Sequence, residues 1–423
     1  MILSRRFLAA ALAVLPLVAF AADPVLKSGD RVAIIGDSIT EQKLYSKYME
    51  CYLLACSGVP ELKVFQFGWS GETAGGFANR VENDLGVFKP TVATTCYGMN
   101  DGGYQPWKDQ IGQGYEQNMR NAAKKMEAIG VKTIVFGSPG AVDTKFFGAR
   151  PSFGGGNSAD GYNDNLAHLR DIEKKLAEEY KQKFANVHDA MIDTMKKAKA
   201  GLGEDYPVCG GDGFHPGPNG QLIMAYAFLK ALGCDGDIGT ITVDAKGEAK
   251  ATAGHKVLSA KDGAVEIESA RWPFCFEGDM KSANSTRSIT PYLPINQDLN
   301  RLTLKVTNLA GDKAKVTWGE ETKEFTKDQL AAGINLNAEF SKTPFDGQFG
   351  KLQNAVGNKQ NWETMMIKQW ITNFRNLPGE MKEDPKVQAG LASLREGFVN
   401  QWTKLEENVR KELVPVKHTL KVE

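Results

Sequence analysis

Ser38 stands just after a short apolar run, in the stretch VAIIGDSIT. The apolar run is typical of a strand, and the polar residues after it favour the start of a helix. A serine at that point projects its hydroxyl from a tight turn, where free N–H groups at the helix start could stabilise an oxyanion. Serine and aspartate are also favoured as plain helix caps, so the stretch alone makes Ser38 a candidate nucleophile only.

A serine nucleophile needs a histidine base and a carboxylate that orients the base. Of five histidines, His215 is the best candidate because its loop is rich in glycine and proline and holds Asp212 three residues earlier. That spacing lets one turn of the loop place the carboxylate beside the imidazole Nδ1–H. His168 is expected inside a helix as a surface or packing residue, and His188 is a weaker alternative at a strand end.

Two further stretches supply groups that could hold an oxyanion. FGWSGET places Gly71 after a second expected strand, and CYGMND places Gly98, Asn100 and Asp101 after a third. A glycine lets its backbone N–H approach a reacting carbonyl, and an asparagine side chain is a second donor. With the Ser38 N–H, the Gly71 N–H and the Asn100 amide would form a three-donor oxyanion hole.

The elements that must position these residues alternate between strand and helix over residues 29–235. The expected strands are RVAIIG, LKVFQFG, TVATTCYG, KTIVFGSP and ANVHDA, with amphipathic helical stretches between them. This alternation predicts a parallel sheet with helices on both faces. In such sheets the ligand site lies at the carboxyl ends of the strands, and each candidate falls at such an end or in the loop beyond it.

Taken in order, GDSIT, the glycine of SGET, GMND and DGFHP resemble the four blocks of the SGNH (GDSL-type) hydrolase family. The resemblance covers about residues 29–235 and implies a flavodoxin-like, three-layer α/β/α hydrolase domain at 23–236. By position, it implies a triad of Ser38, His215 and Asp212, with Gly71 and Asn100 joining the Ser38 N–H in the oxyanion hole. The motif residues that would support this set are Asp37, Gly98 and Asp101. The implied mechanism needs no metal and no cofactor.

Two further regions follow this domain. Alternating patterns such as GTITVDAK and RLTLKVTNL predict a small antiparallel β domain at 237–342. Glycine and proline in residues 342–360 suggest a linker. Two apolar stripes with helical spacing, interrupted by LPGE and EDP, predict a helical hairpin within 343–423.

The first residues predict export. Arg5 and Arg6 precede an apolar run, and small residues follow it, so residues 1–22 read as a cleavable signal peptide, with a membrane anchor as the alternative. No later stretch is long and apolar enough to suggest stable membrane insertion, and the protein is expected in the periplasm or outside the cell. Lys plus Arg and Asp plus Glu are equal at 51 each, which argues against nucleic acid as a partner.

The six cysteines would then meet a compartment that permits disulfides. Cys209 and Cys234 are the first choice for a bridge, whereas Cys96 is expected as a buried thiol in a strand. None of the spacings is CxxC, which argues against zinc.

The family resemblance does not identify which ester is cleaved, because members of the family cleave acetyl, lipid and aryl esters and thioesters. Export and a mixture of aromatic and polar residues in two loops favour removal of O-acetyl groups from a poly- or oligosaccharide. The side chains that could contact such a sugar are Trp69, Tyr104, Trp107, Phe146, Phe147, Arg150 and Phe153. Equally, these aromatics could pack the loops. The alternatives are a short-acyl-ester or lysophospholipid esterase, a glycan-binding protein, and an enzyme that transfers the acyl group to a sugar.

Overall fold

Five parallel strands form the central sheet, in the order β2-β1-β3-β4-β5. The computed structural model describes residues 25–147, 159–261 and 263–423. Its central strands are β1 (Arg31–Gly36), β2 (Lys63–Gly68), β3 (Val92–Cys96), β4 (Thr133–Gly137) and β5 (Lys183–Ala185). Beyond their first residues, β1 to β4 are buried, as expected for apolar runs covered on both faces. Gly36 pairs with both Gly68 and Cys96, so the carboxyl ends of three strands meet at one edge.

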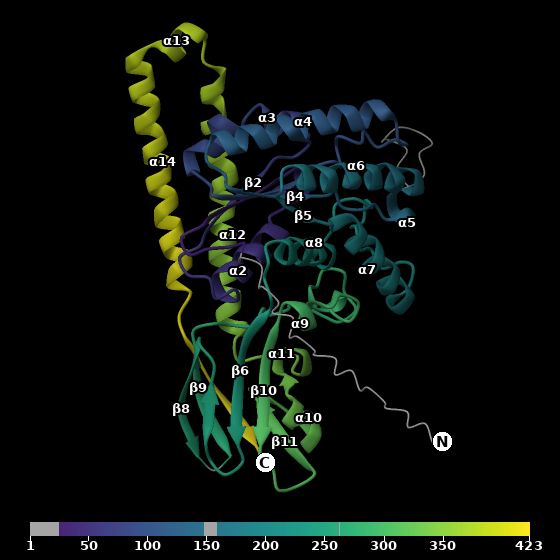
Figure 1. Ribbon diagram of the computed structural model, residues 1–423, viewed down its shortest axis with the longest axis vertical. Helices are drawn as coiled ribbons and strands as arrows, with labels where there is room; N and C mark the ends of the chain where they lie inside the picture. The colour runs from purple at the N-terminus through teal and green to yellow at the C-terminus, as the bar shows by residue number, and fades with distance from the viewer. Residues whose placement is uncertain (1–24, 148–158, 262) are drawn as a thin grey trace, which may run out of the picture.

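Helices cover both faces of this sheet (Figure 1). On one face lie α3 (Ala74–Ala78), α4 (Asp109–Ala128) and α6 (Ala159–Glu179), and on the other lie α2 (Tyr45–Ala55), α7 (Val187–Leu202) and α8 (Pro218–Ala231). Short helical segments complete this part, namely α1 (Ser38–Glu41), η1 (Val81–Leu85), η2 (Gly86–Phe88) and α5 (Thr144–Phe147). The predicted three-layer α/β/α arrangement is confirmed.

One strand lies earlier in the chain than predicted. We expected ANVHDA as a strand, but β5 ends at Ala185 and α7 begins at Val187. The reason is local, because the Asn186 side chain accepts a hydrogen bond from the Asp189 N–H and caps the helix. His188 therefore lies in the first turn of α7.

Two further sheets follow at one end of the molecule (Figure 1). One has the order β13-β10-β6-β7 and the other β12-β11-β14-β9-β8. Their strands are β6 (Asp237–Asp244), β7 (Ala249–Ala251), β8 (His255–Lys261), β9 (Ala264–Ser269), β10 (Arg301–Thr307), β11 (Lys313–Trp318), β12 (Glu321–Thr326), β13 (Ile334–Asn335) and β14 (Val416–Val422). The short helices among them are η3 (Arg287–Ile289), α9 (Ile295–Asp298), α10 (Lys327–Ala332) and α11 (Leu336–Glu339). We call this part the β module.

The expectation of a wholly antiparallel β domain ending at residue 342 is wrong in two respects. β6 and β10 pair in parallel, because the chain crosses over between them. In addition, β14 comes from the last residues of the chain and lies between β9 and β11. Alternating residues reveal a strand and its buried face, but they carry no information on the direction or the distance in sequence of its partner.

The helical hairpin is present and longer than predicted. It consists of α12 (Asp346–Gln369) and α14 (Pro385–Lys411), joined by η4 (Ile371–Asn376) and α13 (Gly379–Glu383), and it runs along the body and projects beyond it (Figure 1). The expected linker at 342–360 is wrong, since most of it belongs to α12. Phe349, Leu352 and Val356 are buried at helical spacing, and this burial outweighs the glycines that suggested a loop.

The predicted bridge between Cys209 and Cys234 is also wrong, because all six cysteines are free thiols. Cys209 is buried against the Met195 sulfur, and Cys234 lines a separate small cavity with Tyr52 and Arg271. Cys96 is a buried thiol, as predicted.

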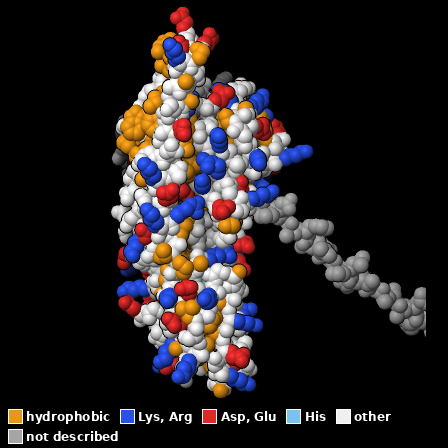
Figure 2. Space-filling model, turned by 90° about the vertical axis from the view of Figure 1, so that its left-hand side faces the viewer, with side chains coloured by type: hydrophobic (Ala, Val, Ile, Leu, Met, Phe, Trp, Pro, Cys, Tyr) orange, Lys and Arg blue, Asp and Glu red, His pale blue; other side chains and the backbone are white. Residues whose placement is uncertain are grey.

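Charged side chains of both signs are interspersed on the face shown in Figure 2, in keeping with the balanced composition. Among the residues that the structure describes, we find no helix with the length and apolar character needed to cross a bilayer.

A chain of hydrogen bonds crosses the core of the β module. The Trp318 indole N–H donates to His418 Nδ1 at 3.2 Å, and His418 Nε2 contacts the Ser269 hydroxyl at 2.9 Å. The hydroxyl lies 2.8 Å from His255 Nδ1, and His255 Nε2 lies 2.9 Å from the Ile238 carbonyl. Since the indole can only donate and the carbonyl can only accept, the chain is fully satisfied when both imidazoles are neutral.

This chain predicts that acid weakens the β module. Burial, with a smaller contribution from His255, lowers the pKa of His418 from 6.5 to about 4. The neutral His418 imidazole therefore makes its full contribution to the free energy of unfolding above about pH 6.5. This contribution, on the order of 3 kcal/mol, is lost as pH falls towards 4. The free energy of urea unfolding should thus depend less on pH between 6.5 and 4 in His418→Gln than in wild type. Equal slopes for the two proteins would contradict the prediction.

Candidate active site

Ser38, His215 and Asp212 form a continuous line of hydrogen bonds at the carboxyl edge of the central sheet. Ser38 Oγ lies 2.8 Å from His215 Nε2, and His215 Nδ1 lies 2.7 Å from Asp212 Oδ2. Ser38 comes from the first turn of α1, directly after β1, whereas the other two residues come from the loop before α8. The three residues are partly exposed.

The loop around Asp212 holds its carboxylate firmly. Asp212 Oδ1 accepts hydrogen bonds from the N–H groups of Phe214 and His215, at 3.1 and 2.9 Å. Burial by itself raises the pKa of Asp212, but the hydrogen bonds from the His215 ring and from the two backbone N–H groups outweigh it and lower this pKa. The group is therefore an ionised carboxylate at neutral pH, which orients the ring.

Gly213 gives this loop its shape. Its φ is +85°, and a Cβ there would lie 2.3 Å from the Phe147 backbone nitrogen. The Gly213 carbonyl accepts a hydrogen bond from Asp143 N–H at 2.8 Å, and Asp143 is buried in an ion pair with Lys199 at 2.6 Å. The loop that carries the imidazole is thus anchored to α5 and α7.

Gly71 lies in a tight turn after β2. The Glu72 N–H donates to the Trp69 carbonyl at 3.1 Å, and Gly71 adopts a φ of +74°, which glycine accepts without strain. Within the described residues, the backbone N–H groups of Gly71 and Ser38 donate to no protein acceptor. Two backbone donors, in the turns that follow the paired ends of β1 and β2, are therefore available to an oxyanion.

The Asn100 side chain is oriented by three neighbours. Its Oδ1 accepts from the Tyr104 hydroxyl at 3.0 Å, and its Nδ2 donates to the Glu72 carbonyl at 3.0 Å. Nδ2 also lies 3.5 Å from Asp37 Oδ2. The amide nitrogen is thus fixed between the nucleophile's turn and the Gly71 turn.

Asp37 and Asp101 stabilise these turns by accepting hydrogen bonds from backbone N–H groups. Asp37 accepts from the Ile39 N–H at 3.0 Å and caps α1, while Asp101 accepts from the N–H groups of Ala74 and Gly98 at 2.9 and 3.1 Å. Burial raises the pKa of Asp37 to about 7 and that of Asp101 to about 6. The two carboxyls link the first, second and third strand ends.

Sequence reasoning missed a buried ion pair behind the Gly71 turn. Arg80 Nε and Glu72 Oε1 are 2.7 Å apart, and both side chains are almost fully buried. Glu72 also accepts from the Tyr97 hydroxyl at 2.7 Å, and Arg80 donates to the Phe67 carbonyl at 3.0 Å. A separation of eight residues gives no periodic signal, so only the fold shows that Glu72 anchors the turn.

Residues 34–223 match the sequence model of the GDSL-like lipase/acylhydrolase family. This part of the chain belongs to that family. The finding confirms the resemblance drawn from the four motifs, and the site described above lies within the GDSL-like domain.

The family match and a curated relative of the GDSL-like domain support a carboxylic ester hydrolase. An acetylxylan esterase from Geobacillus stearothermophilus is 25% identical over 228 residues, which are 49% of this chain and 95% of that protein. The crystal structure of an acetylxylan esterase from the same organism gives a TM-score of 0.40 and 23% identity, and the match covers 49% of this chain and 95% of that one.

A third comparison extends beyond the GDSL-like domain. The structure of a gut microbial diltiazem-metabolizing enzyme matches with a TM-score of 0.73 and 22% identity, covering 94% of this chain and 98% of that chain. The shared fold therefore includes the β module and the helical hairpin as well.

The predicted sugar-contacting aromatics of the GDSL-like domain mostly pack against protein. Phe147 is buried and stacks on Tyr162 with ring centroids 5.5 Å apart, and half-buried Tyr104 stacks on the same ring at 5.3 Å. Trp107 stacks on His168 of α6 instead, at 4.4 Å, and lines a hollow between α4 and α6. These contacts favour the packing alternative for all three side chains.

The other side chains that were predicted to contact a sugar are Phe146, Trp69, Arg150 and Phe153. The ring of half-buried Phe146 lies 5.5 Å from Lys199 Nζ, and the ring of half-buried Trp69, next to the Gly71 turn, lies 5.1 Å from the Arg80 guanidinium. Arg150 and Phe153 fall outside the described residues.

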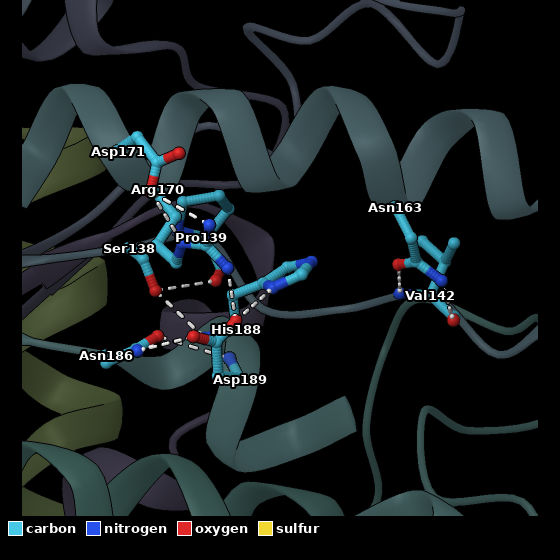
Figure 3. A network of polar contacts seen from close by, with 9 residues as sticks. All are labelled: Ser138, Pro139, Val142, Asn163, Arg170, Asp171, Asn186, His188 and Asp189. Atoms are coloured by element: carbon cyan, nitrogen blue, oxygen red, sulfur yellow. Dashed lines mark hydrogen bonds and ion pairs between the residues drawn. The ribbon is translucent and has the colours of Figure 1, made fainter. Parts of the chain in front are cut away.

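His188, the weaker alternative base, belongs to a separate network (Figure 3). Its Nδ1 lies 3.0 Å from Asp189 Oδ1, and its backbone N–H donates to Ser138 Oγ at 2.9 Å. Asp189 is also paired with Arg170 of α6. This network ties β4, α6 and α7 together, so His188 has a structural setting and not the partners of a base for Ser38.

Proposed function

We propose that this protein is a serine ester hydrolase that removes O-acetyl groups from a poly- or oligosaccharide. The observation that carries the proposal is the line of hydrogen bonds from Ser38 through His215 to Asp212, together with two unpaired backbone N–H groups in the turns after β1 and β2. A hydroxyl activated by an oriented imidazole, next to preorganised donors, is the arrangement that acyl transfer requires.

In the proposed mechanism, His215 Nε2 accepts the Ser38 proton while Ser38 Oγ attacks the ester carbonyl carbon. The resulting oxyanion accepts hydrogen bonds from Ser38 N–H, Gly71 N–H and the Asn100 amide. His215 then gives its proton to the leaving alkoxide, which leaves an acyl-serine. Water, deprotonated by His215, attacks the acyl carbon, and the acid and free Ser38 are released.

The acetylxylan esterase relative and the composition of the loops support an acetylated carbohydrate as the substrate. The turns around Ser38 are built from glycines and polar side chains, which suit a short acyl group better than a long apolar chain. We further propose that the protein is exported, on the basis of the basic and apolar residues in the first 22 positions.

The test is to measure acetate release from acetylated xylan and other acetylated polysaccharides, beside p-nitrophenyl esters of increasing chain length. We expect acetate release from at least one polysaccharide and a preference for acetyl over longer acyl groups. A preference for long-chain esters would contradict the substrate proposal. Binding of a glycan by well-folded protein, without turnover of any ester, would contradict the proposed hydrolase.

Asn100→Ala should lower kcat by about 10²–10³-fold and change KM little, because an oxyanion-hole donor acts mainly in the transition state. Steady-state kinetics with p-nitrophenyl acetate checks the prediction. Asn121→Ala, at an exposed position of α4, is the matched control and should behave as wild type. A rise in KM with unchanged kcat would show that Asn100 acts in ground-state binding instead.

A further inference from the structure

The helical hairpin reaches the edge of the sheet at which the candidate active site lies. Near the start of β2, Lys359 Nζ of α12 donates to the Val64 carbonyl. Just past the end of β2, Lys368 Nζ lies 5.0 Å from the centroid of the Trp69 ring. The carboxyl end of α12 therefore lies at the carboxyl edge of the sheet.

At that edge, Lys368 holds a carboxylate of the nucleophile's own helix. Its Nζ lies 2.8 and 3.0 Å from the two carboxylate oxygens of Glu41, the last residue of α1. Glu41 Oε2 also accepts hydrogen bonds from the N–H and the hydroxyl of Ser70, at 2.5 and 2.6 Å. Because Ser70 precedes Gly71, one carboxylate joins the helix that carries Ser38 to the turn that carries a proposed oxyanion donor.

This contact is better shielded than an ordinary surface ion pair. The Lys368 and Glu41 side chains are 28% and 18% exposed. Burial raises the pKa of Glu41, but the hydrogen bonds from Lys368 and Ser70 outweigh it and lower this pKa. Glu41 is thus ionised at neutral pH and can hold both partners at once.

The hairpin does not depend on Lys368 for its attachment. Thr364 donates to Gln66 Oε1 at 3.1 Å, and Gln66 Nε2 donates to the Thr40 carbonyl at 2.8 Å. Earlier in α12, Lys359 is fully buried and paired with Glu50 of α2. Removing the Lys368 ammonium should therefore leave α12 in place and release only Glu41.

We propose that Lys368 is a positioning residue for the proposed ester hydrolysis, which acts through Glu41 and Ser70 to fix the Gly71 N–H relative to Ser38. This inference rests on the proposed function and deepens it. It makes the C-terminal hairpin a part of the catalytic apparatus, since a residue more than 300 positions away from Ser38 sets the geometry of the oxyanion hole.

The test compares Lys368→Met with Lys368→Arg and with Lys351→Met, a change at an exposed position of the same helix. For p-nitrophenyl acetate, we expect Lys368→Met to lower kcat by about 10–100-fold with KM within about threefold of wild type, because a small misplacement of a catalytic group is costly. Lys368→Arg should restore most of kcat, and Lys351→Met should match wild type. The melting temperature, measured by circular dichroism, should stay close to that of wild type in all three.

A double variant isolates the route of the effect. If Lys368 acts through Glu41, then Lys368→Met combined with Glu41→Gln should lose little more kcat than the more damaging single change. Losses that multiply would overturn this route.

Unchanged kcat in Lys368→Met, with active wild type, would overturn the inference and leave the proposed function standing. A lower melting temperature with raised KM and no rescue by arginine would overturn it too, since it would show a purely structural role. If wild type turned over no ester, the proposed function would fall and this inference with it.

Discussion

Ser38→Ala should lower kcat for ester hydrolysis by on the order of 10⁵-fold or more, since the alanine offers no oxygen to form the acyl-enzyme. The effect should fall on turnover and not on folding. The turn around Ser38 is held by Asp37, which accepts from the Ile39 N–H, and the pair of His215 and Asp212 does not involve the Ser38 hydroxyl. Acetate release from the best polysaccharide and hydrolysis of p-nitrophenyl acetate measure the loss.

Ser28→Ala is the matched control, because Ser28 is exposed and precedes β1, whereas Ser38 follows the carboxyl end of that strand. It should retain wild-type kcat. Labelling adds a direct readout, since a fluorophosphonate should modify wild type at Ser38 and leave Ser38→Ala unmodified, as found by mass spectrometry of the intact protein. Wild-type turnover in Ser38→Ala would show that another group is the nucleophile.

Lys359→Met should destabilise the protein by about 3–5 kcal/mol, the usual effect of removing one partner from a buried ion pair. The Lys359 side chain is fully buried, and its Nζ lies 2.7, 3.1 and 3.6 Å from carboxylate oxygens of Glu50, Glu363 and Glu406. The Nζ also lies 5.3 Å from the Trp402 ring centroid. These residues join α2, α12 and α14, so the cluster attaches the hairpin to the body.

Charge balance explains why the loss should be large. Burial raises the pKa of Glu50 to about 8 and also raises the pKa of Glu363, while Lys359 lowers both. Without the ammonium, buried carboxyls would have to take up protons or remain unpaired. The pKa values of these carboxyls in the folded protein would then lie further above their pKa values in the unfolded chain. The free energy of unfolding would therefore fall as pH rises through and above the pKa values of the unfolded chain.

Urea unfolding followed by circular dichroism tests this at two pH values. The deficit of Lys359→Met relative to wild type should be larger at pH 8 than at pH 5, and adding Glu50→Gln should recover part of it. Lys351→Met, exposed on the same helix, should unfold like wild type. A deficit below about 1 kcal/mol, the value of a surface pair, would contradict the buried-cluster account.

The site residues were predictable because chemistry at a parallel sheet uses local patterns. A serine after an apolar strand and a histidine three residues after an aspartate are short-range features that the fold brings to one edge. Asp212 and His215 needed only one turn of a loop to meet. The catalytic roles of these residues remain proposals that the variants above test.

The sequence by itself determined the α/β domain, its family and the candidate site, because strand and helix periodicity and the motifs are local. Only the tertiary structure decided the parallel pairing of β6 with β10, the return of β14, the free state of Cys209, and the contacts of Lys368 and Lys359. Each of these joins segments far apart in the chain. Their partners are chosen by packing and by the pairing of buried charges, and neither leaves a repeating pattern in the sequence.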